Sequence, residues 1–409
     1  MSLNSTPASE RVHIAFFGCR NAGKSSLVNA VAAQKLSVVS DVKGTTTDPV
    51  KKTMELLPIG PVVIIDTPGI DDEGSLGEMR VKRAKEILAQ TDIAVLVVDG
   101  VKGLNDSDRE LIDIFTDRKL PFIVAFNKSD LINEDALTDN QKADLKATNS
   151  ISVSALEGTN IWELKEMIGH LTKDAQSDKQ IVSDLLSPGD LAVLVIPIDE
   201  SAPKGRLILP QQQTCRDLLD HNMMAICCQD TELTATLDKL KDKPKIVITD
   251  SQAFARVSKD TPEDITLTSF SILFARYKGS LEPLVKGAAT LSKLKSGDRV
   301  LISEGCTHHR QCNDIGTFKI PNWIKKFAGA EVNCSFTSGG EFPDDLSEYK
   351  LVIHCGGCML NEKAMQSRIK TAVDAGVPIV NYGIAIAHMN GVLRRSLAPF
   401  PDIQKLLDE

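Results

Sequence analysis

The sequence predicts an α/β protein of three domains, each a mainly parallel sheet with flanking helices, and a phosphate-binding loop in the first domain. Apolar stretches of strand length alternate with helical stretches, which is typical of parallel sheets covered on both faces. A glycine-rich motif follows the first apolar stretch. The length of 409 residues corresponds to two or three domains at about 150 residues each.

The first domain is expected over residues 11–172. Its apolar stretches predict strands that end in polar or glycine-containing turns, over residues 12–17, 62–66, 93–99, 122–127 and 150–153. The stretches between or after them predict helices over residues 24–34, 78–90, 107–116 and 161–171. Strand and helix therefore alternate through this domain.

The first strand runs into residues 18–25, which read GxxxxGKS. The glycines allow backbone N–H groups to surround phosphates, and the following helix start favours anions. Lys24 supplies a positive charge to the β- and γ-phosphates, and the Ser25 hydroxyl is a ligand for Mg²⁺. The alternative is a glycine-rich turn before an ordinary helix, which the strand, lysine and serine together disfavour.

A second phosphate-side element is Asp66-Thr-Pro-Gly69, at the carboxyl end of an apolar strand. Asp66 can hold Mg²⁺ through water, and the Gly69 N–H can reach a γ-phosphate. Alone, this turn would be unremarkable at the end of a strand. After a phosphate loop, it indicates the metal side of a nucleotide site.

The base-recognition element is Asn127-Lys-Ser-Asp130, again after a strand. The Asp130 carboxylate can accept two N–H bonds from a guanine edge, which adenine cannot offer. Ser154 and Ala155 close the base site. The four elements in this order predict a guanine-specific nucleoside triphosphatase.

Residues 44–49, Gly-Thr-Thr-Thr-Asp-Pro, resemble the first switch of the Era/TrmE branch of translation-factor-type GTPases. The resemblance implies that Thr46 ligates Mg²⁺ and that Thr47 replaces a usual arginine. Ile70 stands where Ras-like families carry a water-orienting glutamine, so hydrolysis should be slow. Asn21 is similar to the asparagine of potassium-activated members, although it could also cap a turn.

The residues expected to act in hydrolysis are Lys24, Asn21, Thr46 and Gly69. The GTP contacts are expected from Gly18, Asn21, Ala22, Gly23, Lys24, Ser25, Ser26, Thr45, Thr46, Asp66, Gly69, Asn127, Lys128, Asp130, Ser154 and Ala155, with Mg²⁺ on Ser25 and Thr46 and K⁺ on Asn21.

Residues 173–278 are expected to be a polar linker and a small α/β domain. Strands are predicted over residues 191–197, 206–209, 224–228 and 245–249, and helices over 212–220, 231–240 and 251–257. Cys215, Cys227 and Cys228 are interpreted as structural, because buried cysteine behaves as a small hydrophobe. With no catalytic constellation in view, this domain is a candidate for self-association, for instance by pairing of edge strands.

Residues 279–409 predict a third parallel sheet, with strands over 299–303, 331–335, 351–354 and 378–381 and a helix over 361–375. Cys306-x-His308 follows the first strand and His354-Cys355-x-x-Cys358 the third. Loops at the carboxyl ends of parallel strands line one crevice, so these groups can converge.

Three thiols and imidazole fit either a structural Cys₃His zinc site or a [4Fe–4S] cluster with one exchangeable position. Spacing alone slightly favours zinc, and unligated core cysteines are a third possibility. Cys312 and Cys334 are interpreted as structural.

The composition is that of an ordinary globular protein, with 42% hydrophobic residues, and the formal net charge is −8. A general nucleic-acid coat or anionic-membrane binder would be basic, so neither class is favoured. No apolar run approaches the length of a bilayer span, and the first residues lack the apolar stretch of a signal peptide. A cytoplasmic location with nine reduced cysteines is expected.

A GTPase of this branch followed by CxH…HCxxC resembles the HydF family, the GTPases that mature [FeFe]-hydrogenase, over the whole chain. The resemblance implies a homodimer of GTPase, dimerisation and cluster domains. Cys306, Cys355 and Cys358 would hold a [4Fe–4S] cluster, with His308 a possible fourth ligand. His309 and His354 are alternatives or donors to the ligands.

The implied role is a scaffold or carrier that uses GTP, Mg²⁺ and K⁺. It would accept a transient diiron unit whose ligands are made by the radical-SAM maturases HydE and HydG, and pass it to apo-[FeFe]-hydrogenase. No nucleic acid or membrane partner is implied. GTP would act as a switch that gates the release of partners.

Two other readings remain open. A GTP-dependent ribosome or tRNA factor with a structural zinc tail would need a basic tail with exposed aromatics, and only Arg394-Arg395 stands out. A redox enzyme would need four strong cluster ligands and a second cofactor, and the sequence holds no dinucleotide fingerprint.

Overall fold

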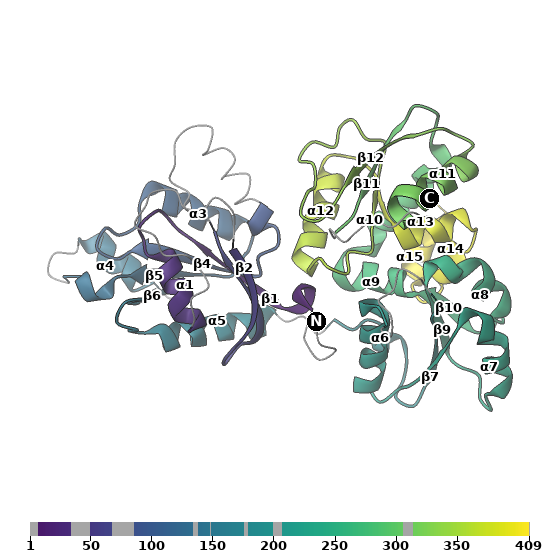
Figure 1. Ribbon diagram of the computed structural model, residues 1–409, viewed down its shortest axis with the longest axis horizontal. Helices are drawn as coiled ribbons and strands as arrows, with labels where there is room; N and C mark the ends of the chain where they lie inside the picture. The colour runs from purple at the N-terminus through teal and green to yellow at the C-terminus, as the bar shows by residue number, and fades with distance from the viewer. Residues whose placement is uncertain are drawn as a thin grey trace. The chain divides into compact units, whose positions relative to one another are not determined.

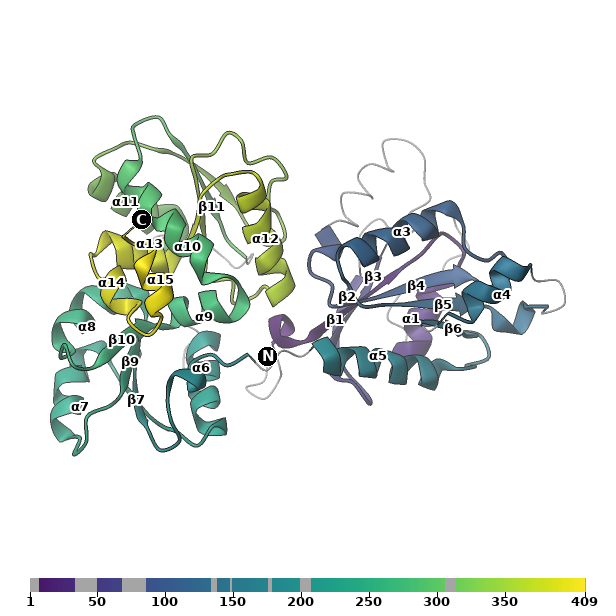
Figure 2. The same ribbon diagram turned by 180° about the vertical axis from the view of Figure 1, so that it is seen from behind.

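The computed structural model describes residues 7–33, 50–67, 86–133, 138–147, 149–175, 179–198, 207–305 and 314–408. The chain divides into two compact units, Met1–Ser177 and Asp178–Glu409 (Figures 1 and 2). The first unit holds one sheet and the second holds two.

The first unit is a six-stranded sheet in the order β2-β3-β1-β4-β5-β6, parallel except for β2. Its strands are β1 Val12–Phe17, β2 Val50–Leu56, β3 Gly60–Asp66, β4 Ile93–Asp99, β5 Phe122–Asn127 and β6 Ser150–Ser152. Its α-helices with described bounds are α1 Lys24–Ala32, α3 Asp106–Asp117, α4 Asp139–Leu145 and α5 Ile161–Ala175, and residues 86–88 are also helical.

The apolar central strands of this sheet are covered on both faces, as their near-continuous hydrophobicity requires. The apolar sides of α1 and α5 pack on one face. Residues 86–88 and α3 pack on the other, where Phe115 lies against Phe17. Strand β2 escapes the sequence prediction because Lys51 and Lys52 leave it no apolar run; it is an antiparallel edge strand with most side chains exposed.

The second unit contains two four-stranded parallel sheets, β10-β9-β7-β8 and β12-β11-β13-β14. The strands are β7 Leu191–Val195, β8 Met224–Cys228, β9 Ile246–Thr249, β10 Thr266–Ser269, β11 Arg299–Ser303, β12 Asn333–Thr337, β13 Leu351–His354 and β14 Ile379–Asn381. The helices are α6 Leu209–Asp220, α7 Leu233–Lys239, α8 Phe254–Asp260, α9 Phe270–Lys278, α10 Leu281–Ala288, α11 Ile320–Ala328, α12 Glu362–Asp374, α13 Tyr382–Met389, α14 Leu393–Ser396 and α15 Pro401–Lys405.

The two sheets of the second unit share one continuous hydrophobic core. Helix α9 lies between them in both views and contacts α6 beside one sheet and α12 beside the other (Figures 1 and 2). The boundary expected near residue 278 therefore falls at the end of a helix inside this unit. The three-domain division stays a sequence-based prediction.

The fold class predicted from the sequence is confirmed: mostly parallel sheets with flanking helices. The strand predicted over residues 206–209 is wrong, because Leu209 begins helix α6. Pro210 stands in the first turn of that helix, where its missing N–H is no loss. Strand β10 and helices α9 and α10 were not predicted. None of the described helices is both long and apolar enough to cross a membrane.

Candidate nucleotide and cluster sites

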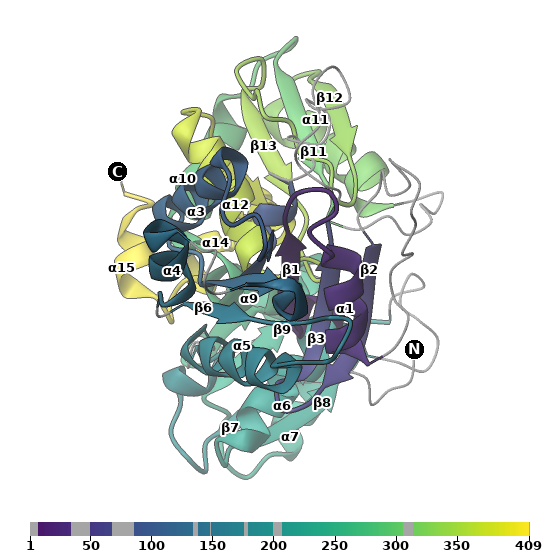
Figure 3. The ribbon, with the colours of Figure 1, turned by 90° about the vertical axis from the view of Figure 1, so that its left-hand side faces the viewer.

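The phosphate loop joins β1 to α1, as Figure 3 shows. Gly23 is the N-cap of α1 with φ +83°, a left-handed conformation that glycine adopts without strain. A Cβ at Gly23 would overlap the side-chain amide of Asn127, and one at Gly18 would overlap the carbonyl oxygen of Val97. The loop is thus pressed against the ends of β5 and β4.

The metal side of the site is built by Lys24, Ser25 and Asp66. Ser25 Oγ donates to Asp66 Oδ2 at 2.8 Å, and Lys24 Nζ lies 3.8 Å from Asp66 Oδ1. Asp66 Oδ1 is buried and has no hydrogen-bond partner among the residues that the structure describes. An orphaned carboxylate oxygen beside a hydroxyl is an oxygen donor set that fits Mg²⁺. These residues would hold the ion, which would neutralise charge on the phosphates.

Asn127 joins the phosphate loop to the base side. Its buried amide donates through Nδ2 to the Ala22 carbonyl at 2.9 Å and accepts at Oδ1 from the Ala155 N–H at 3.0 Å. Both ends of the amide are therefore engaged with the main chain. Asn127 holds the two loops in register.

Asp130 is exposed and accepts from Ser154 Oγ at 2.5 Å through Oδ1. Its Oδ2 has no partner among the described residues and is available to guanine N–H groups. Lys128 Nζ donates to Asp99 Oδ2 at 2.7 Å. Burial alone would raise the pKa of Asp99, but the hydrogen bond and charge of Lys128 outweigh it and lower the pKa. Asp99 was not predicted from the sequence; its position at the end of β4 was the available signal.

Several predicted nucleotide residues cannot be located. Thr45, Thr46, Thr47, Gly69 and Ile70 lie outside the described residues. Ser26 is the third residue of α1, and Asn21 is exposed with φ 61°. The Asn21 side chain makes no hydrogen bond within the described part of the chain, so no turn-capping bond is present there.

The predicted cluster residues follow β11 and β13, which are neighbours in the sheet. Ser303 and His354, the last residues of these strands, are register partners. Strand β12 lies on one side of β11, and β13 and β14 lie on the other. The carboxyl ends of β11 and β13 therefore form the point where the strand order reverses, which is where open parallel sheets bind ligands. Cys306 and His308 themselves lie outside the described residues, as does His309.

Cys355 is the best-described candidate ligand. Its Sγ accepts from the Gly305 N–H at 3.0 Å and from the Gly357 N–H at 3.4 Å. Backbone N–H groups directed at sulfur favour the thiolate, the form that binds metals. Burial nevertheless raises the pKa of Cys355 to about 11 and raises that of Cys358, so without a metal both thiols are protonated at neutral pH.

Both ring nitrogens of His354 have hydrogen-bond partners. Its Nδ1 lies 2.6 Å from the Cys355 carbonyl oxygen, and its Nε2 lies 2.9 Å from Arg368 Nη1. Because Arg368 can only donate, Nε2 is the acceptor and Nδ1–H donates to the carbonyl. Burial, followed by the charge of Arg368, lowers the pKa of His354 to about 3. His354 therefore holds the Cys355 main chain and has no free nitrogen for a metal.

Among the residues that the structure describes, no group of three His, Cys, Asp or Glu side chains could hold a metal ion. The described part offers two thiols, Cys355 and Cys358, with N–H donors on the first. This donor set fits a thiolate-bound iron–sulfur cluster or zinc, and a third protein ligand has to come from elsewhere in the chain.

Arg368 and Lys278 are functional candidates that the sequence reasoning missed. Both are buried close to the two cysteines. The signal for Arg368 was present: it occupies the buried stripe of α12 formed with Met365, Ile369 and Ala372. A charged residue at an apolar position of an amphipathic helix needs an explanation.

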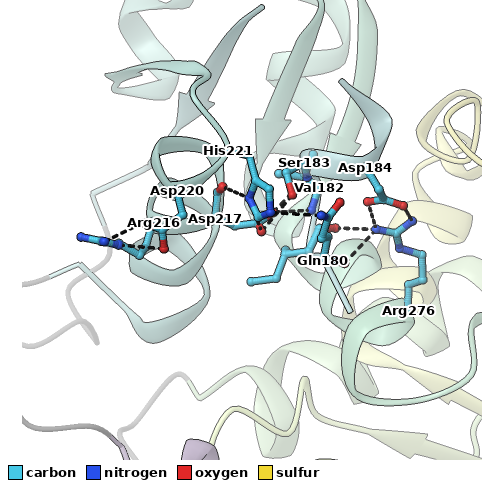
Figure 4. A network of polar contacts seen from close by, with 10 residues as sticks. Gln180, Val182, Ser183, Asp184, Arg216, Asp217, Asp220, His221 and Arg276 are labelled. Atoms are coloured by element: carbon cyan, nitrogen blue, oxygen red, sulfur yellow. Dashed lines mark hydrogen bonds and ion pairs between the residues drawn. The ribbon is translucent and has the colours of Figure 1, made fainter. Parts of the chain in front are cut away.

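A separate polar network ties residues 180–184 to α6 and α9 (Figure 4). Asp217 accepts from the N–H groups of Val182 and Ser183 at 2.8 and 2.9 Å. Arg276 donates to the carbonyls of Gln180 and Ile181 and pairs with both oxygens of Asp184. These groups satisfy one another and form a structural clamp.

The other singled-out residues have structural surroundings. Arg395 donates to the carbonyls of Ser258, Thr261 and Pro262, and Arg394 pairs with Asp408. This pair is therefore engaged within the unit. Cys215, Cys227, Cys228 and Cys334 are free thiols. The interpretation of Cys227 as a buried cysteine is wrong, because its side chain is exposed on strand β8.

Family models match most of the chain. The hydrogen maturase F dimerization domain matches residues 181–279, and the hydrogen maturase F tetramerization domain matches residues 282–399. A model described as 50S ribosome-binding GTPase matches residues 13–128. The first two together cover more than half of the chain.

Individual relatives match about two fifths of the chain. The tRNA modification GTPase MnmE of Acetivibrio thermocellus is 31% identical over 163 residues, 40% of this chain and 35% of the relative. GTPase Der of Kosmotoga olearia is 33% identical over 170 residues, 39% and 38% of the two chains. The chain thus spans about a third of the length of these curated relatives.

Solved structures include Era of Aquifex aeolicus, with a TM-score of 0.35 and 21% identity, covering 53% of this chain and 92% of that one. A P-loop GTPase domain at the N-terminus is followed by both domains characteristic of one maturase family. The chain therefore belongs to the hydrogen maturase F family.

Proposed function

We propose that this chain binds and slowly hydrolyses GTP, holds a [4Fe–4S] cluster, and acts as a scaffold that delivers a diiron precursor to apo-[FeFe]-hydrogenase. The observation that carries the cluster part is the pair of backbone N–H groups directed at Cys355 Sγ, with Cys358 three residues on. Main-chain donors to sulfur stabilise a metal-bound thiolate. Cys306 is the proposed third ligand, and His308 a possible fourth.

The role of each group follows from its geometry. Gly305 and Gly357 orient Cys355, and His354 holds the carbonyl of the same residue. The cluster, when bound, would supply an iron with a position that the protein thiolates leave open. The diiron unit is cargo, made with the radical-SAM maturases HydE and HydG as proposed partners.

The test is the metal and sulfide content after anaerobic purification and iron–sulfide reconstitution, with EPR on the dithionite-reduced protein. We expect about four iron and four sulfide per chain, and loss of both in Cys358→Ala. The matched control is Cys334→Ala, a half-buried cysteine in β12 that is not a proposed ligand. One tightly held zinc with no EPR signal would reject the cluster and favour a ribosome or tRNA factor with a structural zinc tail.

The GTPase part rests on the buried Asp66 oxygen and on Lys24 and Ser25 beside it. We propose that these hold Mg²⁺ and the phosphates, with Thr46 as a further Mg²⁺ ligand and the Gly69 N–H on the γ-phosphate. Asp130 reads guanine. Nucleotide state would then switch the loops that carry Thr46 and Gly69 and gate partner release.

Asn21 is proposed to bind K⁺, which would supply positive charge during hydrolysis. Its exposed amide, which has no hydrogen bond within the described residues, supports this role. Turnover should be at least tenfold faster in KCl than in NaCl, and Asn21→Ala should remove the difference while GDP affinity is kept. Equal wild-type rates in the two salts would refute the potassium role.

Self-association is proposed to use β8, which pairs with β7 and is an edge strand within the described residues. Its outward side chains include Met224, 54% exposed, and Cys227. An unpaired edge with apolar side chains is suited to pairing with a second copy. Met224→Lys should halve the mass measured by light scattering, whereas Val373→Lys, another exposed apolar position, should leave it unchanged.

A further inference from the structure

Arg368 is a buried cation in the interior of helix α12, with 6% of its surface exposed. Its Nη1 donates to Ser303 Oγ at 3.2 Å and to His354 Nε2 at 2.9 Å. Its Nη2 donates to the Gly339 carbonyl at 2.5 Å. The guanidinium also lies over the Phe342 ring, 5.2 Å from the ring centroid. All of these partners are uncharged.

Within the described residues, no carboxylate lies at ion-pair distance from the Arg368 guanidinium. Burying a charge without a counter-charge is strongly unfavourable, and arginine cannot escape by losing its proton. Such a residue therefore points to an anion that occupies the site. One of its acceptors, His354, directly precedes Cys355, so the guanidinium is bonded to the residue next to a candidate ligand.

A second buried cation flanks the other cysteine. Lys278, at the end of α9, is 3% exposed and donates from Nζ to the Leu360 carbonyl at 3.2 Å. Leu360 lies two residues after Cys358. The two cations come from different helices, and each donates a hydrogen bond to a residue within two positions of one of the two cysteines.

We propose that Arg368 and Lys278 are positioning residues that supply the resident counter-charge for an anionic thiolate-bound cluster, and so set its reduction potential. This inference rests on the proposed cluster function. Three thiolates outweigh the positive charge of the cluster core, and each added electron increases the negative charge. A fixed cation nearby therefore favours both binding and reduction.

The experiment measures cluster content and the midpoint potential, by EPR-monitored titration, in the reconstituted full chain. Arg368→Gln should make reduction at least tenfold less favourable, which for one electron is a midpoint about 59 mV lower. Arg368→Lys keeps the charge and should stay within threefold of the wild type. Arg395→Gln removes an arginine that also donates to three main-chain carbonyls, and should leave the midpoint potential of the cluster unchanged.

The outcomes separate the two proposals. If the wild type holds no iron–sulfur cluster, the proposed function fails. If Arg368→Gln loads fully and keeps the wild-type potential, or if Arg368→Lys loses as much as Arg368→Gln, the counter-charge role is overturned. Should Arg368→Gln not fold, Lys278→Met decides by the same potential measurement, with exposed Lys286→Met as its control.

Discussion

Asn127 is the residue whose loss should disturb the phosphate and base sides of the nucleotide site together. Replacing it with alanine removes the donor to the Ala22 carbonyl and the acceptor for the Ala155 N–H. Both main-chain groups then lack their partner in a region where Asn127 is only 2% exposed. The same change leaves open space beside Gly23.

The expected size follows from these two bonds. A buried main-chain group left unsatisfied costs about 1–3 kcal/mol. Two such groups, partly relieved by water entering the space, give about 3 kcal/mol off the unfolding free energy of the first unit. At about 1.4 kcal/mol per tenfold, the unfolded fraction rises roughly 100-fold. GDP affinity should fall by at least about tenfold, because both loops lose their common anchor.

The assay must report on the first unit alone. The chain has two tryptophans, Trp162 on α5 and Trp323 on α11. In a Trp323→Phe background, urea unfolding followed by fluorescence reports on α5. Asn127→Asp is the matched variant, since it keeps the shape and the acceptor for Ala155 but sets an oxygen against the Ala22 carbonyl. If Asn127→Ala unfolds within about 0.5 kcal/mol of the wild type and binds GDP equally well, the tether role is refuted.

Two further predictions use single side chains. Asp130→Asn should lower GTP affinity about 100-fold and improve binding of xanthine nucleotides, because the amide offers one donor and one acceptor where the carboxylate offered two acceptors. Titration with each nucleotide measures both affinities. Unchanged GTP affinity would exclude Asp130 as the residue that recognises guanine. Arg276→Met should destabilise the second unit by about 2 kcal/mol, since two main-chain carbonyls lose a charged donor. Urea unfolding of a Trp162→Phe background, followed by Trp323, measures it. Arg216→Met, at an exposed position on α6, is the control and should leave the urea unfolding midpoint unchanged. If Arg276→Met and Arg216→Met have equal effects, the clamp does not stabilise the second unit.

The sequence predicts this fold well where strands are continuously apolar. Residues 93–99, 122–127 and 351–354 were each predicted to the residue, because a strand buried on both faces leaves an unbroken apolar run. Edge and amphipathic elements were harder. Strand β2 carries exposed lysines, and residues 207–209 look apolar enough for a strand until Pro210 is seen as a helix start.

The site residues, too, were predicted where they belong to a motif and missed where they come from distant helices. Motifs with fixed spacing placed Lys24, Ser25 and Asp66 together, because the loop and the strand that carry them are neighbours in the sheet. Residues that reach the site from distant helices carry no such spacing. Arg368 comes from α12 and Lys278 from α9, and only the fold reveals that both lie beside the cysteines.

The clamp shown in Figure 4 determines at which residue a folded fragment of the second unit can begin. The polar appearance of residues 173–189 suggests a dispensable spacer, yet Ile181 and Val182 are in the core and Arg276 binds the backbone beside them. A fragment of the second unit that began after residue 185 would open the hydrophobic core and leave Arg276 without the carbonyls it binds. Proteolysis and fragment design should therefore keep the whole second unit, Asp178–Glu409.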